Sequence, residues 1–336
     1  MSRMKRGELI RKTTDFMRVK NYSAETIENY TNIISSYLGY ILARKDIVAL
    51  GHKKRIESYL TWLVITKDVS PSTQNVHLSA LVLLHNKVLG LDIQGINAVR
   101  AKYRHRIPPI LSHEQVISLI GALPNEHRTA VKIMYGTGLR IKEALRLRIK
   151  DLDFGNQKII VHEGKGNKDR DVGMPAPLFE ELKRQIEIAL AQWKIDRSHR
   201  IEGVYLPHAL AIKYPKAPFS KDWYWLFPNK NLGHDPETHL MRRHHVYPYI
   251  VERAFQTARE KLGLPIYTTP HAMRHACFTH IAQDMYRQGF PEKMIKGHLR
   301  DMAGHITEDT IKAYLHLAAP TNARIRSPLE LISEEH

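Results

Sequence analysis

The chain has 336 residues, which is enough for two domains of ordinary size. Hydrophobic residues make up 43% and charged residues 25% of it, so it can bury a core and does not belong to the disordered class. Its 51 Lys and Arg residues exceed its 34 Asp and Glu residues by 17, which indicates a polyanionic partner, either nucleic acid or an anionic membrane surface. The single cysteine, Cys277, excludes a disulfide framework and argues against a thiolate metal site.

No stretch approaches the roughly eighteen consecutive apolar residues of a membrane-spanning helix. The basic N-terminus also lacks the apolar segment that follows in a secretory signal. We therefore expect a cytoplasmic, nucleic-acid-binding protein with no membrane partner.

The N-terminal region has the periodicity of helices and no convincing strand. Ser23 is placed to cap a helix whose apolar residues recur at three- and four-residue steps, and Pro71 suits the first turn of another. These features predict a small helical bundle with a basic face, because the first 107 residues hold 18 Lys and Arg against 8 Asp and Glu. The expected helices cover residues 9–19, 24–42, about 54–65, and the stretch after Pro71.

The densest basic run stands just before Pro108-Pro109, a dipeptide that interrupts a helix and marks a linker between domains. Such a run can be a solvated tail. Beside an N-terminal region of net charge +10, however, a linker that lies along DNA phosphates is the better interpretation. Its basic residues are Arg100, Lys102, Arg104 and Arg106.

After the linker, helices surround one small sheet. Ser112 and Gln115 have the spacing of a capping box, which opens a helix. Two short β-like runs flank the turn signal Gly155-Asn156, and a glycine-rich turn leads into a third run. The predicted fold is mainly α with a small antiparallel sheet (α+β). The β-like runs cover residues 151–154, 158–161 and 170–173.

Two segments each present a cation beside a glycine-rich turn. Arg140 follows Gly136-Thr-Gly-Leu at the start of an amphipathic helix, where backbone N–H groups also favour an anion. Lys165 lies in the turn Gly164-Lys165-Gly-Asn, which lacks the ending of a Walker A motif and so does not imply ATP. Taken alone, the two segments are more simply explained as an exposed arginine at a helix N-terminus and an ordinary charged hairpin.

Two further segments supply histidines, an arginine and a tyrosine. His271, Arg274 and His275 are three and four residues apart, so they project from one helical face. Two imidazoles at this spacing can share zinc, but the glutamate of His-Glu-x-x-His is missing and the arginine would repel a cation, so we predict no metal site. Thr307 can cap a helix that carries Tyr314, which by itself would be taken for a half-buried core aromatic.

The combined inventory has cations, imidazoles and one tyrosine but no carboxylate pair, which suits a phosphodiester. Two guanidiniums can grip both non-bridging oxygens and the charge that grows on them in the transition state. A phenol becomes a nucleophile when nearby cations stabilise its anion. An imidazole can take its proton, and a lysine can protonate the departing 5′ oxygen. We expect no cofactor, because the cations do the work of a metal.

Six residues, taken in order, resemble the Arg–Lys–His–Arg–His–Tyr set of the tyrosine recombinases. His305 stands nine residues before the tyrosine, the usual interval of that family, whereas His298 of a second Gly-His pair stands sixteen before it. The resemblance covers nearly the whole chain and implies a two-domain, C-shaped DNA clamp. The six residues are Arg140, Lys165, His271, Arg274, His305 and Tyr314. The implied parts are a helical core-binding (SAM-like) domain over residues 1–100, a basic linker over 101–109, a catalytic domain over 110–320 and a tail over 321–336.

The resemblance also implies a role for each of the six residues. Tyr314 would cleave one strand, form a 3′-phosphotyrosine link and release a 5′-hydroxyl, and rejoining would need no ATP. Arg140 and Arg274 would hold the scissile phosphate, and Lys165 would be the general acid. The two histidines would assist proton transfer and positioning. The family further implies a homotetramer assembled on DNA, in the bacterial cytoplasm and associated with the nucleoid when bound.

The interval between Lys165 and His271 is longer than a plain tyrosine recombinase needs. The added stretch, about residues 195–245, resembles that of the integron integrases, which recombine gene cassettes through folded single-stranded sites as well as duplex ones. Its flat side chains can stack on unpaired, extrahelical bases. The alternative is that its tryptophans only pack the insertion onto the domain. We expect some of each, with Trp225 buried and Trp223 stacked on a DNA base. The DNA-binding residues assigned here are Trp223, Pro236, Arg242, Arg243, His244 and His245.

Three alternatives stay open at this point. The chain could be another tyrosine recombinase of phage or chromosomal type. It could relax supercoils as type IB topoisomerases do with similar residues. The third alternative is a DNA-binding regulator that has kept the fold and lost the chemistry. It stays open because the stretch between His275 and His305 is longer than usual for the family, which affects the local geometry of the site.

Overall fold

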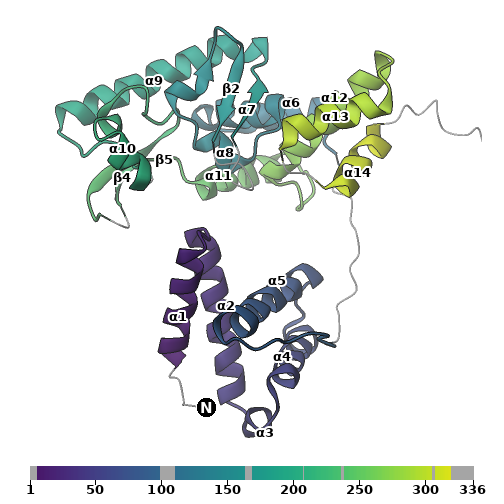
Figure 1. Cartoon of the computed structure of the whole chain (residues 1–336). Coiled ribbons are helices and arrows are strands. Elements are labelled where there is room, and N and C mark those ends of the chain that lie inside the picture. Colours follow the sequence, from purple (N-terminus) through teal and green to yellow (C-terminus); the bar gives the residue numbers. More distant parts are fainter. Residues whose placement is uncertain are drawn as a thin grey trace, which may run out of the picture. The chain divides into compact units, whose positions relative to one another are not determined.

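The computed structural model describes residues 6–98, 110–162, 169–206, 208–235, 238–304 and 307–318. The chain forms two compact units, Met1–Arg106 and Ile107–His336 (Figure 1). Both are mainly helical, and the second holds small antiparallel sheets, which confirms the predicted fold class. In the part of the chain described, no helix combines the length and the apolar character that crossing a lipid bilayer requires.

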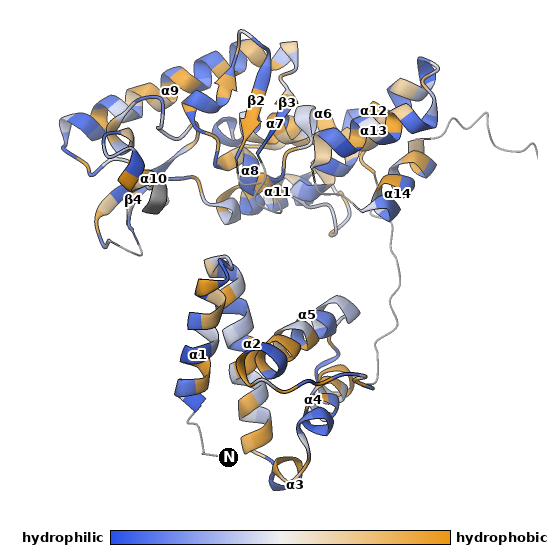
Figure 2. Cartoon of the chain, in the orientation of Figure 1, coloured by the Kyte–Doolittle hydropathy of each residue, from blue (hydrophilic) through white to orange (hydrophobic). Residues whose placement is uncertain are grey.

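The N-terminal unit is a helical bundle, and no strand occurs between residues 6 and 98. Helix α2 has the predicted bounds, and the Ser23 hydroxyl accepts the Thr26 N–H at 3.2 Å as its N-cap. In Figure 2 hydrophobic and hydrophilic residues lie on different sides of α1, as one-sided burial requires. The fully buried rings of Tyr37 and Tyr59 meet edge-on in the core. The helices are α1 (Arg6–Val19), α2 (Ala24–Leu42), α3 (Lys45–Val48), α4 (His52–Lys67) and α5 (Pro71–Val82), which continues as a π-helical turn (Leu83–Val88).

The second unit begins with the predicted capping box, in which the Ser112 hydroxyl and the Gln115 side chain each bond the other's backbone N–H. Its first sheet is the predicted meander, with antiparallel order β1–β2–β3. The third strand runs from Arg170 to Gly173, as predicted, and the side chain of its first residue bonds to Glu143 of the helix Ile141–Leu145. The elements are α6 (His113–Ala122), α7 (Asn125–Thr137), α8 (Ile141–Leu145), β1 (Leu152–Asp153), β2 (Lys158–Val161) and β3 (Arg170–Gly173).

The remaining elements are those of the insertion and the helices on either side of it. Helix α12 packs against both α7 and α14. Figure 1 shows α12, α13 and α14 grouped at one end of the unit and the long helix α9 at the other. These elements are α9 (Phe179–Ser198), α10 (His208–Lys213), β4 (Pro228–His234), β5 (Met241–His245), α11 (Pro248–Lys261), α12 (Pro270–Arg287), α13 (Glu292–Ala303) and α14 (Glu308–Ala318).

The insertion is organised around a buried ion pair that joins α9 to the β4–β5 hairpin. The Arg243 guanidinium donates to both carboxylate oxygens of Asp196, at 3.0 and 2.6 Å. The Tyr224 hydroxyl donates to the same carboxylate at 2.6 Å. The third guanidinium nitrogen donates to the carbonyls of Asn229 and Lys230 at 2.9 and 2.7 Å. A charge that is buried in this way is tolerated because each of the three guanidinium nitrogens has a partner.

Changing Asp196 to Asn should lower the free energy of unfolding by about 3–5 kcal/mol, because it leaves the buried Arg243 charge without its counter-charge. Thermal unfolding followed by tryptophan fluorescence measures this, since Trp225 belongs to the same hydrophobic cluster as Tyr224, which bonds to Asp196. The matched control is Glu292→Gln, which removes an exposed pair with Lys296 and should cost less than about 1 kcal/mol. Equal melting temperatures for the two variants would contradict the structural role of the pair.

Candidate active site

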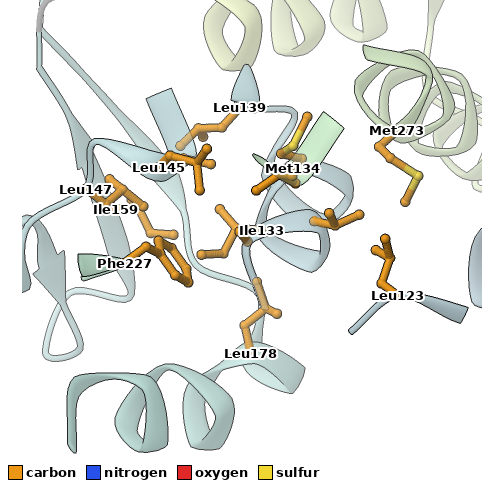
Figure 3. Close-up of a cluster of buried hydrophobic side chains, with 14 of the residues drawn as sticks. Leu123, Ile133, Met134, Leu139, Leu145, Leu147, Ile159, Leu178, Phe227 and Met273 are labelled. Atoms are coloured by element: carbon orange, nitrogen blue, oxygen red, sulfur yellow. The ribbon is translucent and has the colours of Figure 1, made fainter. Parts of the chain in front are cut away.

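Arg140 is presented by a turn that only glycine fits. Helix α7 ends at Gly138, whose φ of +69° is left-handed, and a Cβ built there would lie 2.6 Å from the Phe278 ring. The next residue, Leu139, is fully buried, and Figure 3 shows it together with Leu145 of α8 inside the hydrophobic cluster of this unit. Since the residues on both sides are anchored in the core, Arg140 is held at the N-cap of α8.

Glu143 organises two arginines around this turn. One of its oxygens accepts from Arg140 Nη1 at 2.9 Å and the other from the Arg140 backbone N–H at 2.9 Å. Arg170 of β3 donates to the same carboxylate at 2.8 and 3.2 Å and to the Met302 carbonyl at 3.3 Å. Burial alone would raise the pKa of Glu143, but the hydrogen bonds from Arg170 and Arg140 hold that pKa below its usual value. The carboxylate is therefore charged and joins β3 and the end of α13 to the start of α8.

Arg274 is the second cation of the site, and it is buried at 3% exposure on α12. Its guanidinium donates to the Gly138 carbonyl and to the Ala303 carbonyl, the latter at 3.0 Å, and it lies 4.7 Å from the centre of the Phe278 ring. Burial and the nearby charge of Arg140 lower the pKa of Arg274 to about 10. The charge of Arg140 thus acts on Arg274, and Arg274 itself remains charged at neutral pH, as a site for an anionic phosphate requires.

Tyr314 lies on α14, which Thr307 caps as predicted by accepting the Thr310 N–H at 3.3 Å. The residue is only 4% exposed, and its ring packs on Phe278, the ring that also underlies Arg274 and Gly138. Burial raises the pKa of Tyr314 to about 12, whereas the charges of Arg274 and Arg140 act in the opposite direction. The phenol is therefore neutral at rest and lies within the field of both arginines.

The two histidines of α12, His271 and His275, form a chain of contacts that ends at Tyr314. The His275 Nδ1 lies 2.6 Å from the Tyr314 hydroxyl. The His271 ring is edge-on to His275, with ring centres 4.8 Å apart. His271, one of the histidines predicted for catalysis, is therefore connected to Tyr314 through His275. His275, to which we assigned no role, makes the direct contact.

Several predicted site residues lie outside the described residues. These are Lys165, His305, Pro236 and the linker residues Arg100, Lys102, Arg104 and Arg106. The competing His298 is described. It lies on the exposed side of α13, whereas its neighbours Ile295 and Leu299 on the same helix are fully buried.

Some of the predicted DNA-binding residues of the insertion are buried, and others are half-buried. Trp225 is buried, as predicted, while Trp223 is half-buried with Lys150 Nζ 4.1 Å from its ring centre. The structure contradicts the prediction that Arg243 contacts DNA. All three of its side-chain nitrogens bond to protein groups, and it is only 5% exposed. Arg242 is paired as well, with the Val204 carbonyl at 3.2 Å.

His244 and His245 are half-buried on β5. Burial lowers the pKa of His244 and lowers the pKa of His245 to about 4, so both imidazoles are neutral at pH 7. The His244 ring stacks on Tyr247, with ring centres 6.3 Å apart. Neutral aromatic rings are suited to stacking rather than to pairing with phosphate charge. Within the described ranges, no group of three or more His, Cys, Asp or Glu side chains is placed to hold a metal ion.

Two family models match the chain. The model of the phage integrase family matches residues 109–320, and that of the phage integrase N-terminal SAM-like domain matches residues 9–95. An integrase/recombinase of Escherichia coli is 35% identical over 317 residues, which cover 94% of this chain and 91% of that protein. The tyrosine recombinase XerA of Pyrococcus furiosus is 25% identical, with 94% of this chain and 91% of that protein covered.

Two solved structures share the fold. The Tn1549 transposon integrase in complex with circular intermediate DNA has a TM-score of 0.59 at 18% identity, with 98% of this chain and 99% of that chain covered. The XerH site-specific recombinase bound to a palindromic difH substrate, a post-cleavage complex, has a TM-score of 0.58 at 18% identity, with 94% and 82% covered. The family models and the relative from Escherichia coli, in contrast, show more than a shared fold: the chain belongs to the phage integrase family and is a tyrosine recombinase.

Proposed function

We propose that this recombinase cleaves and rejoins DNA through a 3′-phosphotyrosine link at Tyr314. The observation that carries the proposal is the buried Tyr314 phenol, which lies in the field of the Arg274 and Arg140 charges. The two arginines hold the scissile phosphate and the charge that develops on it. Lys165 protonates the departing 5′ oxygen, and His271 and His305 assist proton transfer and positioning.

DNA is the proposed partner, as a duplex and as a folded single strand. Proteins of the same fold, XerH and the Tn1549 integrase, were determined with DNA bound. This chain has a net charge of +17, and +10 of it lies in the first 107 residues. That charge favours contact with phosphates. We propose that the linker residues also contact phosphates, namely Arg100, Lys102, Arg104 and Arg106. On DNA the protein acts as a homotetramer, and each protomer contributes the domains and the tail outlined from the sequence.

Within the family we propose the integron type, which integrates and excises gene cassettes at hairpin and duplex sites. The insertion supports this because it carries flat side chains that are partly exposed: Trp223, His244 and His245 are half-buried, and the two imidazoles are neutral. Such rings, with Pro236 and Arg242 nearby in the sequence, can receive bases that a folded single strand extrudes.

A hairpin with extrahelical bases should bind at least tenfold more tightly than the matched perfect duplex, because each stacked base contributes about 1–3 kcal/mol. The Trp223→Ala variant should lose most of this preference and keep its affinity for the duplex. Fluorescence anisotropy at one fixed salt concentration measures both affinities. Equal binding of hairpin and duplex by the unchanged protein would remove the integron assignment and leave the recombinase.

A nicked substrate tests the chemistry itself, because the short fragment that carries the released 5′-hydroxyl diffuses away after cleavage, and its loss traps the covalent complex. The proposal predicts a protein–DNA band that survives denaturing electrophoresis. A regulator that only binds DNA would give none, and this result would overturn the proposed function. Relaxation of supercoils without cassette excision would instead identify an activity of the topoisomerase type.

A further inference from the structure

His275 contacts the proposed nucleophile, although it is not one of the six residues of the family set. Its Nδ1 lies 2.6 Å from the Tyr314 hydroxyl oxygen, and the ring centres are 5.5 Å apart. The two residues stand on different helices, α12 and α14, 39 positions apart in the chain. A hydrogen bond of this length between a half-buried and a buried side chain fixes the direction of the phenol O–H.

The protonation states define which group donates. Burial, followed by the charges of His271 and Arg274, lowers the pKa of His275 to about 4, so its ring is neutral at pH 7. Tyr314, with its pKa raised to about 12, is a neutral phenol. The phenol therefore donates and the unprotonated Nδ1 of His275 accepts. The lone pairs of the tyrosine oxygen are left facing away from His275.

The groups that act on this pair come from several elements. His271 and Arg274 lie on α12 with His275, and the charge of Arg140, at the start of α8, acts on Tyr314. The buried thiol of Cys277 stays neutral, because burial raises its pKa to about 12. The positive charges favour the phenolate over the phenol and disfavour the imidazolium over the imidazole. A phosphate bound between the arginines would neutralise part of the charge that opposes protonation of His275.

We propose, resting on the proposed function, that His275 is a further catalytic residue and is the general base for Tyr314. As the bond from the tyrosine oxygen to phosphorus forms, the phenol proton moves to His275 Nδ1. The bond from phosphorus to the 5′ oxygen breaks, and that oxygen takes a proton from Lys165. On rejoining, the 5′-hydroxyl attacks the phosphotyrosine and returns its proton to the lysine, while the proton on His275 returns to the tyrosine oxygen.

The size of the effect follows from the acidity of the phenol. With a pKa of about 12, the phenolate fraction at pH 7 is only about 10⁻⁵ and rises tenfold with each pH unit. A base within hydrogen-bond reach removes that dependence and contributes about 10²–10⁴-fold when its pKa lies near the operating pH, and a bound phosphate that offsets the charge of Arg274 shifts the pKa of His275 in that direction. The unchanged protein should therefore cleave at a rate that is flat from about pH 6 to 8.5. A protein without the base should cleave slowly and faster at each higher pH.

The experiment is single-turnover cleavage of the nicked substrate at saturating DNA, from pH 6 to 8.5, with three variants. His275→Phe removes the acceptor, and His275→Asn keeps an acceptor that cannot take a proton. Both should cleave about 10²–10³-fold more slowly at pH 7, with rates that rise with pH and with unchanged DNA affinity. The control is His280→Phe on the same helix, where a buried imidazole 2.8 Å from the Tyr135 hydroxyl is lost, and its pH profile should match the unchanged protein.

Two results would overturn the assignment. A His275→Asn variant that cleaves at the full rate would mean that the hydrogen bond only orients the phenol. A deficit in His275→Phe that is the same at every pH would mean that the ring only packs. These results are distinct from a failure of the proposed function, in which the unchanged protein itself forms no adduct at any pH.

Discussion

Replacing Tyr314 by Phe should abolish the covalent protein–DNA adduct and leave DNA affinity within about threefold. Phenylalanine fills the same buried space against Phe278, so the variant loses only the hydroxyl that would attack phosphorus. With no other nucleophile in its place, cleavage should fall by more than about 10⁴-fold. Denaturing electrophoresis of the nicked-substrate reaction measures the adduct, and anisotropy measures the affinity.

The matched control is Tyr286→Phe, which removes a hydroxyl from a residue packed against the same hydrophobic cluster. This variant should form the adduct at nearly the normal rate. If the Tyr314→Phe protein still becomes linked to DNA, another residue is the nucleophile and the assignment of Tyr314 is wrong.

Replacing Arg274 by Ala should slow cleavage about 10³-fold or more. The reason is that the variant lacks the buried positive charge that stabilises the negative charge developing on the phosphate in the transition state. The same change leaves the carbonyls of Gly138 and Ala303 without their donor, at about 1–3 kcal/mol for each buried group. Arg274→Lys keeps a charge but cannot span both carbonyls and the phosphate. It should therefore be intermediate in both cleavage rate and stability.

Single-turnover cleavage and thermal unfolding separate the two consequences. Arg287→Ala is the control, since Arg287 stands on the same helix, is exposed and pairs only weakly with Asp284. It should change neither quantity by a measurable amount. An Arg274→Ala protein that cleaves as fast as this control would contradict the role given to Arg274.

Local signals predicted much of the fold. Helix α2 matched its predicted bounds because Ser23 caps it in the chain itself, and the capping box at Ser112 opened α6 in the same way. The β4–β5 hairpin was not predicted, since its strands lack clear alternation and are held by the pair between Arg243 and Asp196, 47 residues apart. Helix α3 was missed because a single turn is too short to show periodicity.

The site was predictable where one short segment carries both the residue and its geometry. The turn before Arg140 and the cap before Tyr314 are of this kind. The bond between Arg170 and Glu143 crosses 27 residues and depends on the fold, so no local pattern indicated it. Arg243 was misassigned for the same reason, because a basic run resembles a DNA contact until its buried acidic partner is known. His275 could have been found, since it shares a helical face with His271 and Arg274.

Peptide mapping of the trapped protein–DNA complex tests the central claim most directly. After nuclease and protease digestion, mass spectrometry should locate a single nucleotide-bearing peptide that contains Tyr314, joined through a 3′-phosphate. A linkage to any other side chain, or a tyrosine joined to a 5′-phosphate, would contradict the account.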